Sequence, residues 1–274
     1  MNAFDPEQFW PMVLAFAQTT TRRVGQKLLI DVGSAQPEEK GDGSLVTASD
    51  QWADAELREA IATEFPDHGV LSEEVEHIFP TTDWCWIIDP IDGTTNFSRG
   101  IPMWGISLGL LYQGTPVFGY VYIPPIDQSF YGYWYGTSGL TGPTGAFSNG
   151  KPIQVRTDDP SPNQFFSLCA RSTHILKHDQ PFPCKIRMMG VATYNLLLVA
   201  SGVAIGAVEA TPKIWDIAAV WAIVQAAGAN WIPLDNNPIF PLKVGENYGQ
   251  QPFPTFVVSR AELETVFRPW LMAR

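Results

Sequence analysis

Two aspartates separated by Pro-Ile mark the segment of this sequence whose residue types could do chemistry. Residues 86–98 read Trp-Ile-Ile-Asp-Pro-Ile-Asp-Gly-Thr-Thr-Asn-Phe-Ser, so Asp89 and Asp92 follow a predicted buried strand over 84–88. The Gly-Thr-Thr sequence after them could form a corner whose backbone N–H groups face an anion. Carboxylate oxygens bind hard cations such as Mg²⁺, which commonly also binds substrate phosphate. The segment therefore predicts a site for metal and phosphate chemistry.

Further acidic residues lie where predicted apolar segments meet loops. They are Glu73 with Glu74, Glu209, and Asp216. Plainer explanations stay open, because Asp216 could simply cap its helix and Glu73 with Glu74 could be a solvated pair. If the acids converge in space, they repel one another unless a multivalent cation joins them, and only Arg99 and Lys213 are close by in sequence.

The composition indicates a folded acidic protein. The chain has 274 residues, 45% of them hydrophobic, and a formal net charge of −11. Because phosphate backbones are bound by basic surfaces, this charge argues against nucleic acid as a partner. The N-terminal residues do not read as a secretory signal, and the apolar stretch 101–124 is interrupted by Gln-Gly-Thr-Pro, as in two strands and a turn, so no membrane span is expected. The cysteines Cys85, Cys169 and Cys184 are expected to be structural thiols of a cytoplasmic protein.

The elements that must position the acids follow from apolar spacing. Helical spacing predicts helices over 6–31, 51–64, 194–201, 215–227 and 260–270, with Ser49 or Asp50 as N-cap of the second. Strands are predicted over 70–74, 84–88, 103–112, 117–123, 130–135, 153–156, 165–169, 203–209 and 255–258. The strands over 103–112 and 117–123 are expected to pair antiparallel. Helices first, then antiparallel strands, then alternating elements predict a layered α+β architecture.

One segment only looks like a nucleotide-binding loop. Residues 145–151, Gly-Ala-Phe-Ser-Asn-Gly-Lys, have P-loop spacing, but Pro152 stands where the magnesium-binding hydroxyl is needed. Asn149-Gly150 is instead a strong hairpin-turn signal.

Four motifs in order resemble those of the inositol monophosphatase family. They are 45–50 (Leu-Val-Thr-Ala-Ser-Asp) preceded by Lys40, 72–74 (Ser-Glu-Glu), 86–97, and 215–219 (Trp-Asp-Ile-Ala-Ala) continuing to 227–229. The resemblance covers essentially the whole chain, with departures from the usual glycines at Ser72 and Ala229. It implies an α+β fold, a layered αβαβα sandwich of the inositol monophosphatase and fructose-1,6-bisphosphatase type. It is expected as a single domain, 1–274, with an N-terminal lobe to about 150 and a C-terminal lobe over 151–274.

The resemblance also implies a magnesium-dependent, lithium-sensitive phosphatase, commonly a homodimer, with two to three Mg²⁺ per active site. Glu73, Asp89 and the carbonyl of Ile91 would hold the first ion, and Asp89, Asp92 and Asp216 the second. A third, weaker ion would lie near Glu73. Thr94 with Asp50, or Glu73, would orient and deprotonate the attacking water, and backbone N–H groups of Gly93 and Thr94 would receive the phosphate. The implied substrate contacts are Asp92, Gly93, Thr94, Ala192, Glu209 and Asp216.

The default substrate under this resemblance is inositol 1-phosphate, because the Glu209 carboxylate could accept hydrogen bonds from ring hydroxyls. Histidinol phosphate is the nearest alternative, since its amine would suit Glu209, and a sugar phosphate such as fructose 1,6-bisphosphate is another. Arg171, in the unaligned segment 170–191, could meet a second anionic group or simply be a surface residue. A different class of hypothesis is a regulatory binding protein on the same scaffold, which the intact ligand positions and the acidic charge argue against.

Overall fold

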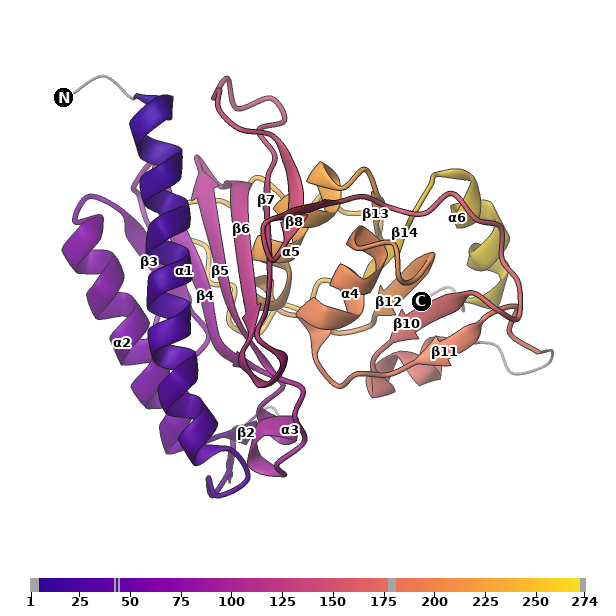
Figure 1. The fold of residues 1–274 in the computed structure, drawn as a ribbon, viewed down its shortest axis with the longest axis horizontal. Coiled ribbons are helices and arrows are strands. Elements are labelled where there is room, and N and C mark those ends of the chain that lie inside the picture. The colour runs from indigo at the N-terminus through magenta and orange to yellow at the C-terminus, as the bar shows by residue number, and fades with distance from the viewer. Residues whose placement is uncertain (1–4, 42, 44, 177–180, 272–274) are drawn as a thin grey trace.

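The structure is a computed structural model that describes residues 5–41, 43, 45–176 and 181–271. Five layers follow one another across the molecule: two helices, a seven-stranded sheet, two helices, a five-stranded sheet and a last helix (Figure 1). This confirms the predicted layered α+β sandwich. The site of interest lies where the middle helices meet the ends of strands from both sheets.

The outer helices are α1 (Pro6–Asp31) and α2 (Ala48–Glu64), which pack against each other and cover one face of the larger sheet (Figure 1). The N-cap of α2 is Thr47, so the prediction of Ser49 or Asp50 was wrong and the helix begins three residues earlier. Thr47 Oγ1 accepts from the N–H groups of Ser49 (3.2 Å) and Asp50 (3.4 Å), while the Asp50 carboxylate accepts from Thr47 N (2.7 Å). This capping box places Asp50 inside the first turn.

The larger sheet has the strand order β3-β4-β5-β6-β7-β8-β9. Its strands are β3 (Gly69–Ser72), β4 (Trp84–Asp92), β5 (Gly105–Tyr112), β6 (Thr115–Ile123), β7 (Gln128–Tyr133), β8 (Gly145–Ser148) and β9 (Lys151–Ile153). Only β3 and β4 run parallel, and β5 and β6 pair antiparallel as predicted. The β8–β9 hairpin turns at Asn149-Gly150, confirming that the P-loop-like segment is a turn. The strand predicted over 153–156 was wrong, because the strand ends at Ile153.

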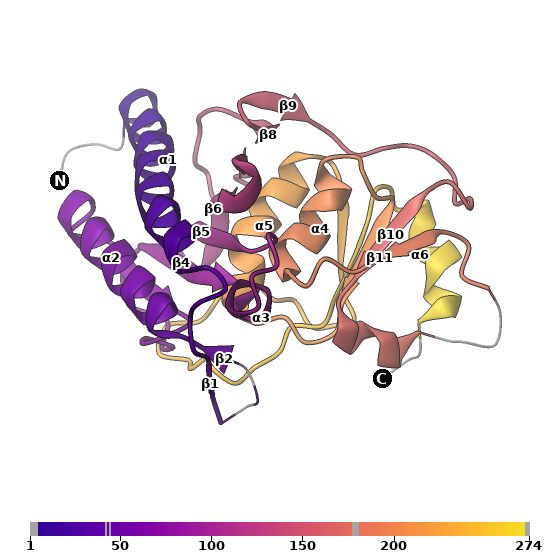
Figure 2. The ribbon, with the colours of Figure 1, turned by 60° about the horizontal axis from the view of Figure 1, so that its bottom comes forward.

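The middle layer consists of α4 (Ala192–Ala200) and α5 (Ile214–Ala226), which both lie between the two sheets (Figures 1 and 2). Glycines of the larger sheet let α5 approach closely. A Cβ on Gly119 would lie 1.9 Å from the carbonyl oxygen of Ala219, and one on Gly109 would lie 2.8 Å from Ala219 N. With small residues on both sides, the helix rests directly on β5 and β6, and its first turn reaches the end of β4.

The smaller sheet has the strand order β11-β10-β12-β14-β13 and is covered outside by α6 (Glu262–Phe267). Its strands are β10 (Phe165–Leu168), β11 (Lys185–Arg187), β12 (Gly206–Glu209), β13 (Asn230–Pro233) and β14 (Thr255–Val258). Strand β12 begins at Gly206 instead of 203, and the predicted helix over 260–270 is α6 followed by a 3-10 turn, Arg268–Trp270. Strands β8, β11 and β13 were not predicted, because they are short and lack clear alternation.

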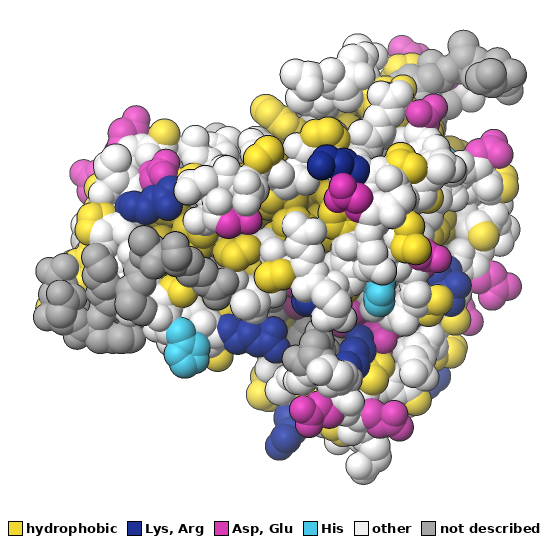
Figure 3. Space-filling view, turned by 180° about the vertical axis from the view of Figure 1, so that it is seen from behind, with side chains coloured by type: hydrophobic (Ala, Val, Ile, Leu, Met, Phe, Trp, Pro, Cys, Tyr) yellow, Lys and Arg dark blue, Asp and Glu magenta, His cyan; other side chains and the backbone are white. Residues whose placement is uncertain are grey.

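The remaining elements are short. They are α3 (Thr94–Ser98), β1 (Glu38–Glu39), β2 (Leu45–Val46), and 3-10 turns at Pro124–Ile126 and Ala170–Ile175. None of the helices in the described residues combines the length and apolar character that crossing a bilayer requires. On the face opposite to that of Figure 1, acidic and basic side chains of the described residues lie intermixed, with apolar side chains exposed among them (Figure 3).

Candidate active site

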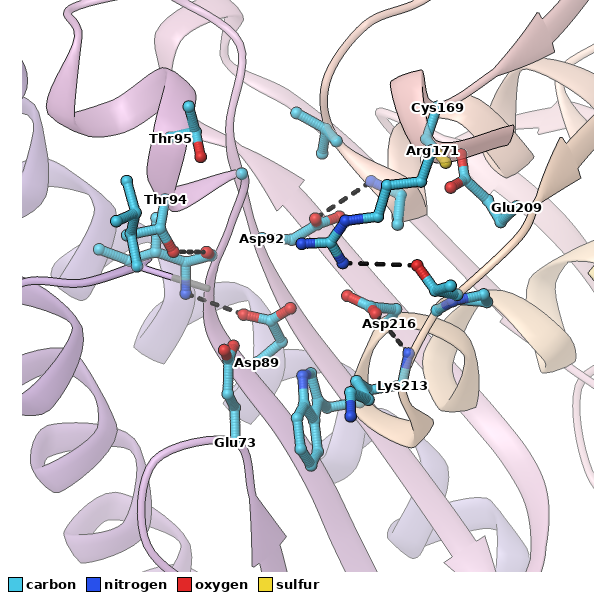
Figure 4. Close-up of a pocket in the computed structure, with 18 of the residues that line it drawn as sticks. Glu73, Asp89, Asp92, Thr94, Thr95, Cys169, Arg171, Glu209, Lys213 and Asp216 are labelled. Carbon is cyan, nitrogen blue, oxygen red and sulfur yellow. Dashed lines mark hydrogen bonds between the residues drawn. The ribbon is translucent and has the colours of Figure 1, made fainter. Parts of the chain in front are cut away.

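A cavity of about 720 Å³ opens where the end of β4 meets the beginnings of α4 and α5. Nearly every residue predicted for the site lines it: Glu73, Asp89, Ile91, Asp92, Gly93, Thr94, Ala192, Glu209 and Asp216. Figure 4 shows the acidic side chains pointing toward one shared space, from the β3–β4 side and from α5. Residues more than a hundred positions apart in the sequence are therefore brought to one place.

Asp89, Asp92 and Asp216 form the centre of the cluster. One carboxylate oxygen from each lies within 4.8 Å of the others. The backbone holds two of these side chains in place: Asp89 Oδ1 accepts from Ile91 N at 3.1 Å, and Asp216 Oδ2 accepts from Lys213 N at 2.6 Å. A break in the β4–β5 register between Asp89 and Asp92 lets both aspartates of the Asp-Pro-Ile-Asp segment take part.

The electrostatics of this cluster fit divalent cations. Asp89 is 1% exposed, and burial raises its pKa well above the usual value, as do the negative charges of Glu73, Asp92 and Asp216. Burial likewise raises the pKa of Asp216, and the charge of Asp92 adds to the effect. Buried oxygens that destabilise one another when ionised are the donor set that a hard cation such as Mg²⁺ would compensate.

Asp92 has a second role that sequence reasoning missed. Its Oδ1 accepts from Ala192 N at 3.1 Å, and its Oδ2 accepts from Thr193 N at 2.7 Å and Thr193 Oγ1 at 2.5 Å. The carboxylate at the end of β4 thus caps the N-terminus of α4, which carries no cap from its own preceding residue. Spacing along the chain contains no signal for a cap supplied from a hundred residues away.

Glu73 lies at the rim of the cluster and is paired with a lysine. Lys40 Nζ lies 3.1 Å from Glu73 Oε1 and 2.8 Å from Glu74 Oε1. Burial raises the pKa of Glu73 from 4.5 to about 7, although the positive charge of Lys40 opposes this. His77 also lines the cavity: its ring stacks on Trp215 with centroids 5.5 Å apart, and its Nε2 lies 2.8 Å from the carbonyl oxygen of Glu73.

The Gly93-Thr94 corner forms the neighbouring wall of the cavity. Gly93 has φ of +95°, the left-handed region that favours glycine, and a Cβ there would meet Val191 Cγ2 at 3.0 Å. Thr94 Oγ1 lies 3.1 Å from both Asp50 Oδ1 and the carbonyl oxygen of Ile91. Asp50 is fully buried and is not among the residues that line the cavity, so Thr94 provides its hydrogen-bonded connection to the site.

The opposite wall carries the residues predicted to meet the leaving group. Glu209, at the end of β12, is 2% exposed and accepts from Asn195 Nδ2 at 2.8 Å. Burial raises its pKa well above the usual value, as does the nearby Cys169 thiol, which also lines the cavity. Arg171 also lines the cavity, with Nη1 3.4 Å from Thr211 Oγ1. Arg171 is thus a cavity residue, which its sequence context left open.

The whole-chain comparison decides the family. The model of the inositol monophosphatase family matches residues 11–257. The chain belongs to this family. Among curated inositol monophosphatase relatives, the fructose-1,6-bisphosphatase/inositol-1-monophosphatase of Aquifex aeolicus is 33% identical over 74% of this chain and 79% of its own length. A histidinol-phosphatase of Chlorobaculum parvum is 32% identical over 71% of this chain and 74% of its own. A solved Thermotoga maritima IMPase superposes with a TM-score of 0.75 and 28% identity, covering 92% of this chain and 94% of its own.

Membership of the inositol monophosphatase family makes the chain a phosphatase that hydrolyses phosphate monoesters. The family is metal-dependent, and the acidic cluster of this chain has the donor set for metal ions. The residue resemblance noted from the four motifs is thereby confirmed.

Proposed function

We propose that this phosphatase hydrolyses a small, hydroxyl-bearing phosphate monoester, with inositol 1-phosphate as first choice, in a reaction that needs Mg²⁺. The observation that carries the proposal is the convergence of Asp89, Asp92 and Asp216 within 4.8 Å beside the Gly93-Thr94 corner. Histidinol phosphate and fructose 1,6-bisphosphate are the alternatives, each matching the name of a relative.

Each wall of the cavity has its own task in this proposal. Asp89, Asp92, Asp216, Glu73 and the carbonyl of Ile91 would hold two to three magnesium ions. Bound Mg²⁺ would neutralise the phosphate, lower the pKa of a water molecule and stabilise the departing alkoxide. The backbone N–H groups of Gly93 and Thr94 would bind phosphate oxygens.

The proton of the attacking water has two candidate acceptors. The Thr94 hydroxyl can accept it while donating its own proton to Asp50 Oδ1, 3.1 Å away. Glu73, which lines the cavity beside the aspartates, is the other. On the leaving-group side, Glu209 and the beginning of α4 at Ala192 would contact the hydroxyl-bearing part of the substrate.

We also propose that the enzyme is a cytoplasmic homodimer and that lithium ions inhibit it. The dimer and the lithium inhibition rest on the family resemblance, and the cytoplasmic location rests on the interpretation of the three cysteines as structural thiols. Sedimentation of the purified chain tests the dimer, and turnover with Li⁺ added at constant Mg²⁺ tests the inhibition.

The deciding experiment is phosphate release from a panel of monoesters, with Mg²⁺ and with chelator. The panel holds inositol 1-phosphate, histidinol phosphate, fructose 1,6-bisphosphate and adenosine 3′,5′-bisphosphate. We expect turnover of inositol 1-phosphate to exceed that of the others and to vanish in chelator. Higher turnover of another compound would make that compound the proposed substrate in place of inositol 1-phosphate. Substantial turnover without metal would contradict the proposed mechanism.

Asp89→Asn tests the role of the carboxylate cluster in this assay. It removes a charge from the cluster, and its side chain can still accept the single hydrogen bond from Ile91 N. We expect a loss of at least about 10²-fold in kcat, the scale at which single stabilising groups act. Asp235→Asn, on an exposed turn away from the cavity, is the control and should keep full turnover.

A further inference from the structure

Two buried asparagines, Asn96 and Asn195, connect the Gly93-Thr94 corner to Glu209 through hydrogen bonds. Asn96 Nδ2 donates to the carbonyl oxygen of Met189 at 2.9 Å, and Met189 N donates to Asn195 Oδ1 at 3.2 Å. Asn195 Nδ2 then donates to Glu209 Oε1 at 2.8 Å. Three hydrogen bonds thus run from α3, next to Gly93 and Thr94, across the approach to α4 and on to the end of β12.

The orientation of Asn195 follows from its partners. Ser167 Oγ donates to Asn195 Oδ1 at 2.8 Å, in addition to the bond from Met189 N, so this atom is the amide oxygen and the NH₂ group faces Glu209. Asn195 and Ser167 are fully buried, which leaves no water to replace these partners. The Glu209 carboxylate is therefore held by a fixed donor and cannot turn freely in the cavity.

The other end of the connection is equally tight. Asn96 Nδ2 also donates to the carbonyl oxygen of Met103 at 2.8 Å, which ties the amide to its own side of the cavity. Gly190, directly after Met189, has φ of +73°, and a Cβ there would come within 2.8 Å of Asn96 Nδ2. The loop before α4 therefore lies directly against the Asn96 side chain.

We propose that Asn195 is a positioning residue: it holds the Glu209 carboxylate in the orientation that lets Glu209 discriminate between leaving groups. Asn96 fixes the other end of this hydrogen-bonded connection, at the Gly93-Thr94 corner. This inference rests on the proposed function and deepens it by naming the substrate class. A buried carboxylate oxygen that is left without a donor when the substrate binds raises the free energy of the complex. The favoured leaving group therefore carries a hydroxyl or ammonium donor near the ester, and one without a donor is disfavoured.

The test compares a substrate that has donors with one whose leaving group has none. Inositol 1-phosphate and 4-nitrophenyl phosphate are assayed with Mg²⁺ for wild type, Asn195→Ala and Asn195→Asp. The aspartate keeps an acceptor for Ser167 and Met189 N but loses the donor to Glu209. We expect the ratio of kcat/KM for inositol 1-phosphate to that for 4-nitrophenyl phosphate to fall at least about tenfold, through the KM of the inositol ester.

A double-mutant cycle tests whether Asn195 acts through Glu209. Glu209→Gln should lower the same ratio, and adding Asn195→Ala to it should lower the ratio little further, because both changes remove one function. Ser201→Ala, on the same chain segment but bonded only to the carbonyls of Leu197 and Leu198, is the control and should leave the ratio unchanged. Thermal unfolding checks that each variant folds. If the Asn195 variants do not fold, Asn96→Ala carries the test, with the same direction expected.

An unchanged ratio in a folded variant would overturn the inference. An equal fall in kcat/KM for both substrates is such a result, and it is what a merely structural asparagine would give. Fully additive effects of Asn195→Ala and Glu209→Gln would do the same. A wild-type protein that releases phosphate from neither ester with Mg²⁺ would instead contradict the proposed function itself.

Discussion

At the scale of single residues, the Thr94 hydroxyl connects a buried charge to the cavity. It lies 3.1 Å from Asp50 Oδ1 and equally far from the carbonyl oxygen of Ile91, and its one proton can serve only one of them at a time. Asp50 in turn is fixed by the capping box of α2. A residue that first explains the start of a helix thus also orients a hydroxyl at the site.

The two candidate bases can be separated by substitution at Thr94. Thr94→Val keeps the shape but removes the hydroxyl, and we expect kcat for inositol 1-phosphate to fall by roughly 10² to 10⁴-fold, the usual contribution of a general base. Thr94→Ser should retain most of the activity. If Thr94→Val keeps near wild-type kcat, the Thr94 hydroxyl is not the base, and Glu73 is left as the candidate. Glu73→Gln is then assayed over a range of Mg²⁺ concentrations, because only a loss of kcat that excess Mg²⁺ does not restore counts for the base. Steady-state kinetics at saturating Mg²⁺ measures both.

At the scale of elements, the residue that joins β4 to α4, Asp92, serves both the carboxylate cluster and the start of the helix. The Asp92 carboxylate accepts three hydrogen bonds from the first turn of α4, and it is also part of the carboxylate cluster. The start of α4 therefore depends on Asp92, a residue at the end of strand β4 in the larger sheet. Asp92→Asn is consequently a poor test of a binding role against an enzymatic one, because it affects the fold as well as the charge.

We expect Asp92→Asn to lower stability in chelator as well as activity in Mg²⁺. One carboxylate oxygen is replaced by an NH₂ group that faces N–H donors of α4, and loss of a cap costs about 1 to 2 kcal/mol. Thr193→Val should produce part of the loss of stability, whereas Asp89→Asn, with one backbone bond at stake, should lose less. Urea unfolding of the four proteins in chelator measures this, and equal midpoints for Asp92→Asn and wild type would refute the capping role.

At the scale of the whole molecule, one apolar cluster joins the two sheets. It contains residues from Leu71 and Ile87 of the larger sheet through α4 and α5 to Val257 of the smaller one. We propose on this ground that the chain is a single domain in which the lobes before and after residue 150 fold together. The carboxylate cluster lies at the same junction, with Asp216 from α5 facing Asp89 and Asp92 from β4.

Metal and pH should therefore act together on the stability of the whole chain. Without metal, the raised pKa of Glu73, from 4.5 to about 7, means that the folded state binds more protons than the unfolded state between these values. Stability from this group is present at low pH and is lost as the pH rises toward 7. Bound Mg²⁺ would favour the ionised carboxylates, so the stabilisation by Mg²⁺ should grow from pH 5 to pH 7.5.

The measurement is the difference in unfolding temperature between Mg²⁺ and chelator at each pH. His68 contributes an opposite trend, because burial lowers its pKa from 6.5 to about 4, so its stability contribution is lost as the pH falls. That contribution is the same with and without metal and cancels in the difference. A difference that stays constant across the range would contradict the prediction, and Glu73→Gln should flatten it.

The sequence by itself determined the long elements and the identity of the acids. Strong apolar spacing predicted α1, the body of α2, α5 and the β5–β6 pair, and four ordered motifs predicted the fold and most of the cavity lining. Boundaries and short strands such as β11 and β13 were missed, because a few residues carry too little periodicity.

Only the tertiary structure decided what depends on distance in space. Asp92 as the cap of α4, His77 beside Trp215, and the amide connection from Asn96 to Glu209 all join groups whose residue types recur throughout any chain. Hydrogen bonding is short-ranged and directional, so such partners are chosen by how helices and sheets pack. The printed sequence shows that Asp89 and Asp216 are acidic. Their approach to within 4.8 Å depends on the close packing of α5 against the glycines of β5 and β6.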